Sequence, residues 1–181
     1  MKQTLLWITC LVFLAGCTGT PKGIEPVTGF NKDRYLGTWY EIARLDHSFE
    51  EGLSQVTAQY TENDDGSIRV INRGYNAETG EWEEAEGRAV FVGDSGTGHL
   101  KVSFFGPFYA SYVVFALDSD YTRAYITGYN RDYLWLMART PQVSDAVLND
   151  FKDTARAKGF DLDELIIVDQ PRQSMPPIPS E

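Results

Sequence analysis

Few side chains in this sequence are grouped in a way that would support catalysis. Asp46, His47 and Ser48 are adjacent, and these residue types form the acid, base and nucleophile of hydrolytic triads. Neighbours in a chain seldom face one another as triad members do, and the sequence has no Gly-x-Ser-x-Gly turn to present a nucleophile. We therefore interpret His47 as a loop residue that forms hydrogen bonds, and we expect no enzymatic activity.

The remaining polar motifs do not indicate a metal, a cofactor or a nucleic acid. The loop 93–98 (GDSGTG) lacks the lysine and the strand–loop–helix setting of a phosphate-binding loop. Two histidines and two cysteines leave little material for a metal site, and His99 has no ligand partner at metal spacing. The net charge of −10 argues against a nucleic-acid partner, because phosphates are bound by Lys and Arg.

The N-terminal residues 1–16 predict a signal peptide. Leu5–Ala15 is an apolar run of eleven residues, too short to cross a hydrocarbon layer of about 30 Å as a helix. The sequence Leu14-Ala15-Gly16-Cys17 resembles a bacterial lipobox. This resemblance implies lipid attachment at Cys17, and Thr18 in place of an aspartate implies the outer membrane. An ordinary signal peptide with an incidental cysteine is the alternative.

Composition divides the mature chain into three parts. Residues 17–28, rich in Gly, Pro and Thr, predict a lipidated N-terminus and a flexible leash. Residues 170–181 contain four prolines and predict a flexible tail. Residues 29–169 between them contain no long linker and no internal repeat, so we expect one domain.

The pattern in this domain is all-β. Eight short runs separated by turn residues predict an antiparallel up-and-down meander that closes into a barrel: Thr38–Arg44, Gln55–Glu62, Ser67–Tyr75, Trp82–Val92, His99–Phe105, Ala110–Asp118, Arg123–Tyr129 and Tyr133–Arg139. A helix is expected from the N-cap Ser144 to Gly159, and its narrow apolar stripe places it outside the sheet. A short ninth strand is expected at Leu165–Val168.

Three motifs in the expected order resemble the lipocalin signatures. They are Gly-x-Trp within Tyr35–Ile42 (YLGTWYEI), the turn Leu117–Tyr121 (LDSDY) and Arg139 after the eighth strand. Longer stretches resemble the bacterial outer-membrane lipocalins: Tyr35–Arg44, Lys101–Tyr109 and Arg131–Trp135. The resemblance implies an eight-stranded barrel with a C-terminal helix packed outside, anchored in the outer membrane by its lipidated N-terminus. It implies that the barrel binds a fatty acid or a lysophospholipid, for lipid storage or transport at the envelope, including membrane stress or repair.

The signature residues Trp39 and Arg139 are expected to close one barrel end rather than to bind ligand. Side chains alternate between the two faces of a strand, and if Trp39 and Arg139 point inward, then Glu41 and Ala43 are also expected to point inward. The sixth strand has two apolar faces, and we take the one with Tyr112, Val114 and Ala116. The predicted ligand-binding residues are Phe91, Val102, Phe104, Tyr112, Val114, Tyr133, Trp135 and Met137. Tyr112 and Tyr133 are candidates for a hydrogen bond to the ligand's polar end.

Four aromatic residues surround the Gly106-Pro107 turn within Phe104–Tyr109. If this hairpin lies at the open end of the barrel, it is a candidate contact for a membrane, an entering lipid or a second subunit in a homodimer. The alternative is a turn folded back on the barrel. A structural or interaction lipoprotein with a filled barrel is the second functional hypothesis.

Overall fold

The computed structural model describes residues 18–171. The predicted signal peptide, the lipid attachment at Cys17 and residues 172–181 of the predicted tail lie outside the described residues. Gln170, where the flexible tail was expected to begin, is held by hydrogen bonds from its side-chain amide to the carbonyls of Glu41 and Val56. Within them, two helices and nine strands follow in order: α1 (Lys32–Tyr35), β1 (Gly37–Leu45), β2 (Leu53–Glu62), β3 (Ile68–Asn76), β4 (Glu81–Phe91), β5 (His99–Phe105), β6 (Phe108–Leu117), β7 (Arg123–Thr127), β8 (Leu134–Ala138), α2 (Asp145–Ala157) and β9 (Leu165–Ile167).

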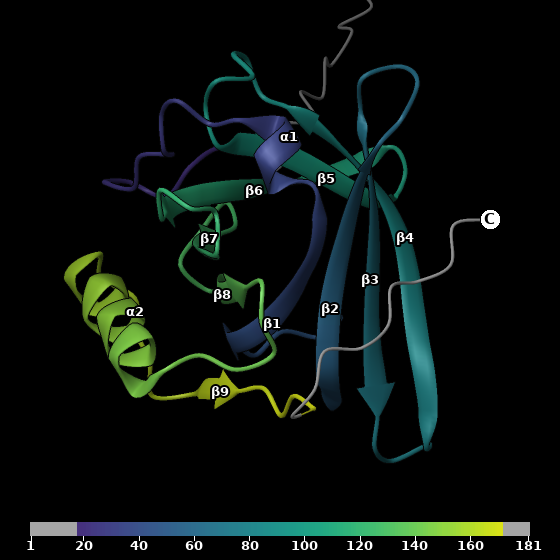
Figure 1. The fold of residues 1–181 in the computed structure, drawn as a ribbon, viewed down its shortest axis with the longest axis vertical. Helices are drawn as coiled ribbons and strands as arrows, with labels where there is room; N and C mark the ends of the chain where they lie inside the picture. Colours follow the sequence, from purple (N-terminus) through teal and green to yellow (C-terminus); the bar gives the residue numbers. More distant parts are fainter. Residues whose placement is uncertain (1–17, 172–181) are drawn as a thin grey trace, which may run out of the picture.

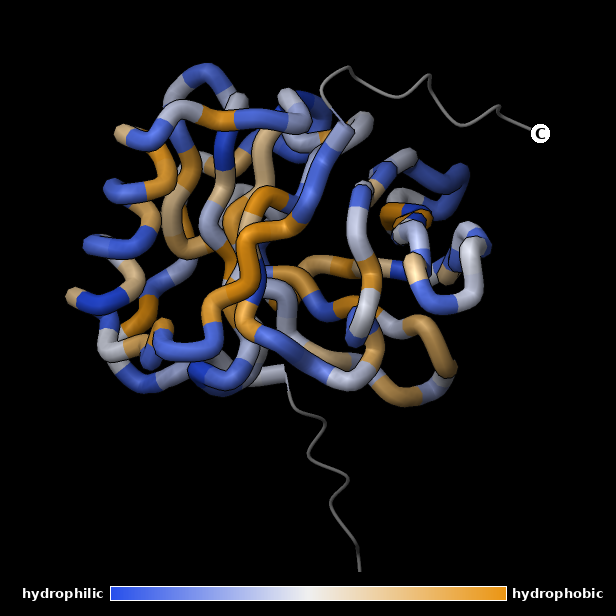
Figure 2. The backbone as a smooth tube through the Cα atoms, turned by 90° about the horizontal axis from the view of Figure 1, so that it is seen from below, coloured by the Kyte–Doolittle hydropathy of each residue, from blue (hydrophilic) through white to orange (hydrophobic). Residues whose placement is uncertain are grey.

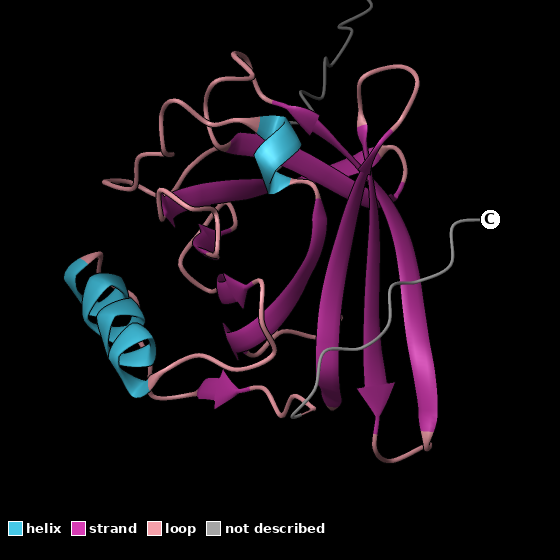
Figure 3. Ribbon diagram, viewed as in Figure 1, coloured by secondary structure: helices cyan, strands magenta, loops and turns pink. Residues whose placement is uncertain are grey.

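The sheet closes on itself, as the sequence predicted. Each strand from β2 to β7 pairs antiparallel with the next one, and β1 pairs with both β8 and β2. Figure 1 shows the resulting eight-stranded barrel, with β9 added beside β1 and the single turn of α1 at the top. A closed barrel leaves no long unpaired strand edge. This chain has few helices that could cover such an edge (Figure 3), so closure of the sheet protects it.

Helix α2 covers the outside of the barrel, and the barrel wall separates the outer hydrophobic core beneath this helix from a second core inside. Phe151 and Ala155 are fully buried against outward-facing residues of β1, β7 and β8, while a second cluster fills part of the interior. In the view from below (Figure 2), the hydrophilic residues of α2 face away from the barrel. The Ser144 side chain accepts a hydrogen bond from the Val147 N–H at 3.4 Å, so the predicted N-cap is confirmed. No helix among residues 18–171 is long and apolar enough to cross a membrane.

The closed end is built around Trp39 and Arg139. The Arg139 guanidinium lies 4.0 Å from the Trp39 ring centre and donates hydrogen bonds to the carbonyls of Thr38, Arg34 and Leu36. These bonds fix α1 and the start of β1 across the end of the barrel. The predicted structural role of the pair is confirmed.

Two β-bulges change which residues face inward. The register of β1 against β8 shifts between Glu41 and Ala43, so Ile42 and Ala43 both pack in the outer core. Ala43 was expected inside, and that prediction is wrong. A second shift lies between Val114 and Ala116, and it likewise moves Ala116 to the outer side.

The segment expected as a flexible leash is packed against the barrel. The Val27 N–H donates to the Val114 carbonyl at 2.9 Å, and the Val27 carbonyl accepts from the Gly98 N–H at 2.8 Å. Ile24 is 1% exposed and belongs to the outer core. The prediction of a leash over residues 17–28 is therefore wrong for the described part of the segment, because two apolar anchors and backbone hydrogen bonds outweigh its polar composition.

Candidate ligand-binding cavity

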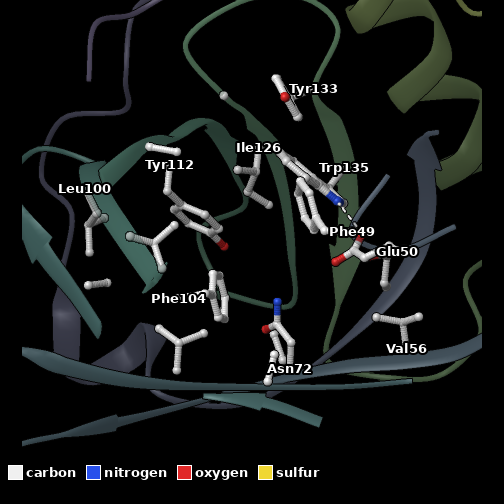
Figure 4. Close-up of a pocket in the computed structure, with 18 of the residues that line it drawn as sticks. Phe49, Glu50, Val56, Asn72, Leu100, Phe104, Tyr112, Ile126, Tyr133 and Trp135 are labelled. Carbon is white, nitrogen blue, oxygen red and sulfur yellow. Dashed lines mark hydrogen bonds between the residues drawn. The ribbon is translucent and has the colours of Figure 1, made fainter. Parts of the chain in front are cut away.

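The barrel encloses a cavity of about 500 Å³ that reaches the surface beside the exposed Phe49, Phe105 and Phe108. This volume lies in the range of small-molecule sites, about 300–1,000 Å³. Its apolar walls come mainly from strands β2 to β6 and β8, and Figure 4 shows Leu100 and Trp135 on opposite sides of the cavity, with Phe104, Tyr112 and Ile126 between them. A cavity with this lining is suited to an apolar chain.

Six of the eight predicted binding residues line this cavity: Val102, Phe104, Tyr112, Tyr133, Trp135 and Met137. Phe91 and Val114 do not. Val114 is fully buried near the closed end, where its backbone bonds to Val27 and Gly98. Phe91 packs edge-on against Phe30, with ring centres 6.0 Å apart. Both predictions are corrected: the chain before α1 fills this end of the barrel, so these side chains belong to the core.

Three tyrosine hydroxyls meet at the bottom of the cavity. The Tyr112 hydroxyl lies 2.7 Å from the Tyr35 hydroxyl and accepts from the Tyr60 hydroxyl at 3.0 Å. Burial raises the pKa of both Tyr35 and Tyr112 well above the ordinary value, so both stay neutral. Tyr112 therefore contacts its neighbours at the floor, while Tyr133 lies at the mouth.

A buried polar network forms one side of the cavity. Arg44 Nη1 donates to Glu41 Oε1 at 2.9 Å, and Glu50 Oε2 lies 3.1 Å from His47 Nε2 and accepts from Trp135 Nε1 at 3.2 Å. Burial raises the pKa of Glu41 well above its usual value. Burial alone would raise the pKa of Glu50 too, but the contacts with His47 and Trp135 hold it below its usual value.

Sequence reasoning found only part of this network. Glu41 follows from alternation, but Arg44 is brought inside by the bulge, and Glu50 belongs to a loop that folds into the barrel. His47 contacts Glu50 of the same loop, with Nε2 3.1 Å from Glu50 Oε2. The run of ionisable residues between the apolar first strand and the second strand was a signal in the sequence that could have indicated this network.

Aromatic side chains surround the mouth. Phe105 and Phe108 are 81% and 71% exposed and lie on the hairpin between β5 and β6, and Phe49 and Tyr129 are also exposed. All four border the cavity, which therefore reaches the surface here. Of the two interpretations of the Phe104–Tyr109 hairpin, the structure favours the one at the open end rather than a turn folded back.

The closed eight-stranded barrel, the Trp–Arg pair at its end, the outer helix and the apolar cavity together define the lipocalin class. The model of the Lipocalin-like domain family matches residues 30–170, and the chain belongs to the lipocalin family. Among residues 18–171, no group of three or more His, Cys, Asp or Glu is arranged to hold a metal ion.

Relatives narrow this assignment. The chain is 54% identical over 169 residues to Outer membrane lipoprotein Blc of Vibrio cholerae, covering 93% of this chain and 99% of the relative. It is 50% identical over 161 residues to Outer membrane lipoprotein Blc of Escherichia coli K12, covering 89% and 91%. These similarities confirm the prediction of a bacterial outer-membrane lipocalin, lipid-anchored at the outer membrane.

Solved structures agree on the fold. Insecticyanin of the tobacco hornworm Manduca sexta superposes with a TM-score of 0.68 at 20% identity, covering 85% of this chain and 88% of that one. The cockroach allergen Per a 4 gives a TM-score of 0.66 at 21% identity, covering 85% and 96%. The relatives named here are lipocalins, a family of binding proteins.

Proposed function

We propose that the protein is a membrane-anchored carrier that holds one fatty acid or lysophospholipid in its barrel, for storage or transport of lipids at the cell envelope. The apolar cavity of about 500 Å³ with aromatic residues at its mouth carries this proposal. The anchor is the acylated Cys17, exposed when a signal peptide of residues 1–16 is removed. No chemistry is required of the protein, because affinity comes from burial of the chain.

The energetics support such a ligand. Burying ten methylene groups contributes roughly 8 kcal/mol, and part of this is lost to association and ordering of the chain. A micromolar dissociation constant corresponds to about 8 kcal/mol, so ten buried methylene groups give weaker than micromolar affinity and a longer acyl chain is needed to reach that range. Such affinity permits both loading and release at a membrane.

The cavity residues divide by depth. Val102, Phe104 and Met137 offer apolar surface to the chain, and Tyr112 at the floor limits how far it enters. Trp135 and Tyr133 lie nearer the mouth, with ring centres 6.0 Å apart, where the polar end of a ligand would leave the barrel. Trp135 therefore serves as a fluorescent reporter of an occupied cavity.

The proposal is tested with the mature chain carrying Cys17→Ser, so that no acyl anchor competes for the cavity. The delipidated protein is titrated with a lysophospholipid and with the matching fatty acid while tryptophan emission is followed. Saturable binding of one lipid per chain, weakened by Trp135→Ala, is expected. A flat titration of folded protein would instead support the second hypothesis, a structural or interaction lipoprotein whose barrel takes no ligand.

A further inference from the structure

The first described residues are held against the outer face of β5 and β6. The Thr18 carbonyl lies 3.1 Å from His99 Nε2, and the Gly19 carbonyl accepts a hydrogen bond from the Ser111 hydroxyl at 2.6 Å. Both partners alternate with residues of the inner core, so their side chains point out of the barrel. The N-terminal segment therefore begins on the wall formed by these two strands.

This contact fixes where the proposed acyl anchor leaves the protein. Cys17 directly precedes Thr18, and consecutive Cα atoms are only about 3.8 Å apart. A long flexible leash would let the barrel turn freely at a distance from the membrane. An acyl group attached one residue from the wall instead brings the outer face of β5 and β6 to the bilayer.

The same two strands end in the aromatic hairpin at the cavity mouth. Phe105 and Phe108 are paired at its tip and are 81% and 71% exposed. Ser111, which holds the N-terminal segment, lies three residues from Phe108 on β6, or about 10 Å at 3.3 Å per residue. The attachment point and the exposed rings are therefore close enough to reach one bilayer surface together.

The charge of this wall also suits a phospholipid surface. Residues 98–117 contain no Asp or Glu, although the chain has 26 of them. Lys101 Nζ lies 5.1 Å from the Tyr109 ring centre, and lysine and tyrosine are both favoured at bilayer surfaces. The neighbouring strand β4 differs, because it carries four exposed glutamates: Glu81, Glu83, Glu84 and Glu86. Anionic lipids would therefore repel the wall of β5 and β6 less than the acidic surface beside it.

Resting on the acyl anchor of the proposed function, we propose that the barrel lies on the membrane that anchors it, with the outer face of β5 and β6 and the tip of their hairpin against the bilayer. The partner is the phospholipid surface of that membrane. The cavity mouth, bordered by Phe105 and Phe108, is held at this surface. Helix α2 lies on another side of the barrel (Figure 1) and stays in water. A lipid then moves between the bilayer and the cavity without crossing the aqueous phase.

The orientation is measured with a fluorescent label on the acylated mature chain. The signal peptide that contains Cys10 is removed and Cys17 is acylated, so one introduced cysteine supplies the only free thiol. Gly106→Cys puts a bimane label at the hairpin tip, where an added Cβ meets no atom within 4 Å. Asn149→Cys puts the same label on an exposed position of α2 as the matched control.

Each labelled protein is reconstituted into vesicles of phosphatidylethanolamine and phosphatidylglycerol that contain a lipid with a shallow nitroxide quencher. The label of Gly106→Cys should lose most of its emission, because it lies at the bilayer surface. The label of Asn149→Cys should lose little.

A longer spacer tests whether the held N-terminus sets this orientation. Twelve Gly and Ser residues inserted between Cys17 and Thr18 span about 20 Å as a flexible coil and release the barrel from the bilayer. The Gly106→Cys label should then recover most of its emission. The same twelve residues added after Glu181 are the control and should leave the quenching unchanged.

The outcomes separate this proposal from the proposed function. Equal quenching of the two labels, or stronger quenching on α2, overturns the orientation and leaves lipid binding by the soluble Cys17→Ser chain standing. Full quenching that persists with the inserted spacer also overturns it, because the hairpin would then dock without the held N-terminus. Mass spectrometry of the mature chain detects the acyl groups separately, and their absence from Cys17 defeats both the orientation and the anchored part of the proposed function.

Discussion

Replacing Arg139 by methionine should open the closed end of the barrel at a large cost in stability. The guanidinium donates to the carbonyls of Thr38, Leu36 and Arg34 at 2.8 Å each, and it covers the Trp39 ring at 4.0 Å. Methionine keeps part of the contact with Trp39 but makes none of these hydrogen bonds. The carbonyls of α1 and the start of β1 then lose the side chain that holds them together.

The size of the effect follows from these contacts. Two of the partly buried hydrogen bonds, to Thr38 and Leu36, are each worth about 1.5 kcal/mol at the low end for a charged donor. The stacking on Trp39 adds about 1 kcal/mol. The expected loss is therefore about 4 kcal/mol, and with a urea slope of about 2 kcal/mol/M it lowers the unfolding midpoint by about 2 M.

Urea unfolding of the delipidated Cys17→Ser chain, followed by circular dichroism and tryptophan emission, measures this shift. Arg156→Met is the matched control, because Arg156 lies exposed on α2 and its nearest carboxylate oxygen, of Asp153, is 3.5 Å away. The control should move the midpoint by less than about 0.3 M, as exposed ion pairs contribute little. A shift below about 0.5 M for Arg139→Met would show that the Trp–Arg pair does not hold the barrel closed.

Four further changes test other parts of the molecule. Ala89→Trp, at a buried position that lines the cavity, should abolish lipid binding in the fluorescence titration while circular dichroism shows an intact fold. Ile24→Ala should cost about 2–4 kcal/mol in urea unfolding, because Ile24 is 1% exposed; a cost near zero would restore the flexible leash. Replacing Phe105 and Phe108 together by serine should change stability by less than about 0.5 kcal/mol but reduce sedimentation with phospholipid vesicles, since both rings are mostly exposed. Burial would raise the pKa of Asp118, but hydrogen bonds from Thr122 and a backbone N–H lower this pKa below its ordinary value. The Asp118 carboxylate therefore stabilises the fold above the ordinary aspartate pKa of about 4, and this stabilisation is lost as the pH falls. Asp118→Asn should therefore flatten the acid limb of the unfolding free energy measured against pH.

The arrangement of the strands could be predicted because each one has its own local signal. Turn residues such as Asn63 to Gly66 separate the runs, and the Trp39 and Arg139 motifs identify the ends that meet. The bulges have no such signal. The backbone at Glu41 and Ala43 gains one residue against β8, and nothing in the apolar pattern of β1 marks the position.

The cavity was predictable only where a strand alternates regularly. Val102, Phe104, Trp135 and Met137 follow from a simple two-residue period on β5 and β8. Val114 also obeys the period and faces inward, but depth along the barrel decides whether such a residue lines the cavity or packs in the core. Depth depends on how far the chain before α1 fills the closed end, which is a contact between distant segments.

Glu50 and the N-terminal segment illustrate the same limit. Glu50 is buried because its loop folds into the barrel and meets Trp135, 85 positions further along the chain. Ile24 sits in a stretch rich in Gly and Pro, and only the outer core formed by other elements makes it an anchor. Composition describes the average character of a segment, whereas a single buried side chain can hold that segment in place.

The central claim, that the barrel carries a single-chain lipid, is tested most directly by native mass spectrometry. The mature Cys17→Ser chain is exposed to a total lipid extract of a bacterial envelope, separated from free lipid and analysed beside its Ala89→Trp variant. We predict one bound lipid with a single acyl chain per protein, and none in the variant. A protein that stays free of lipid, or that takes up two-chain phospholipid equally with and without the Ala89→Trp change, would contradict the account.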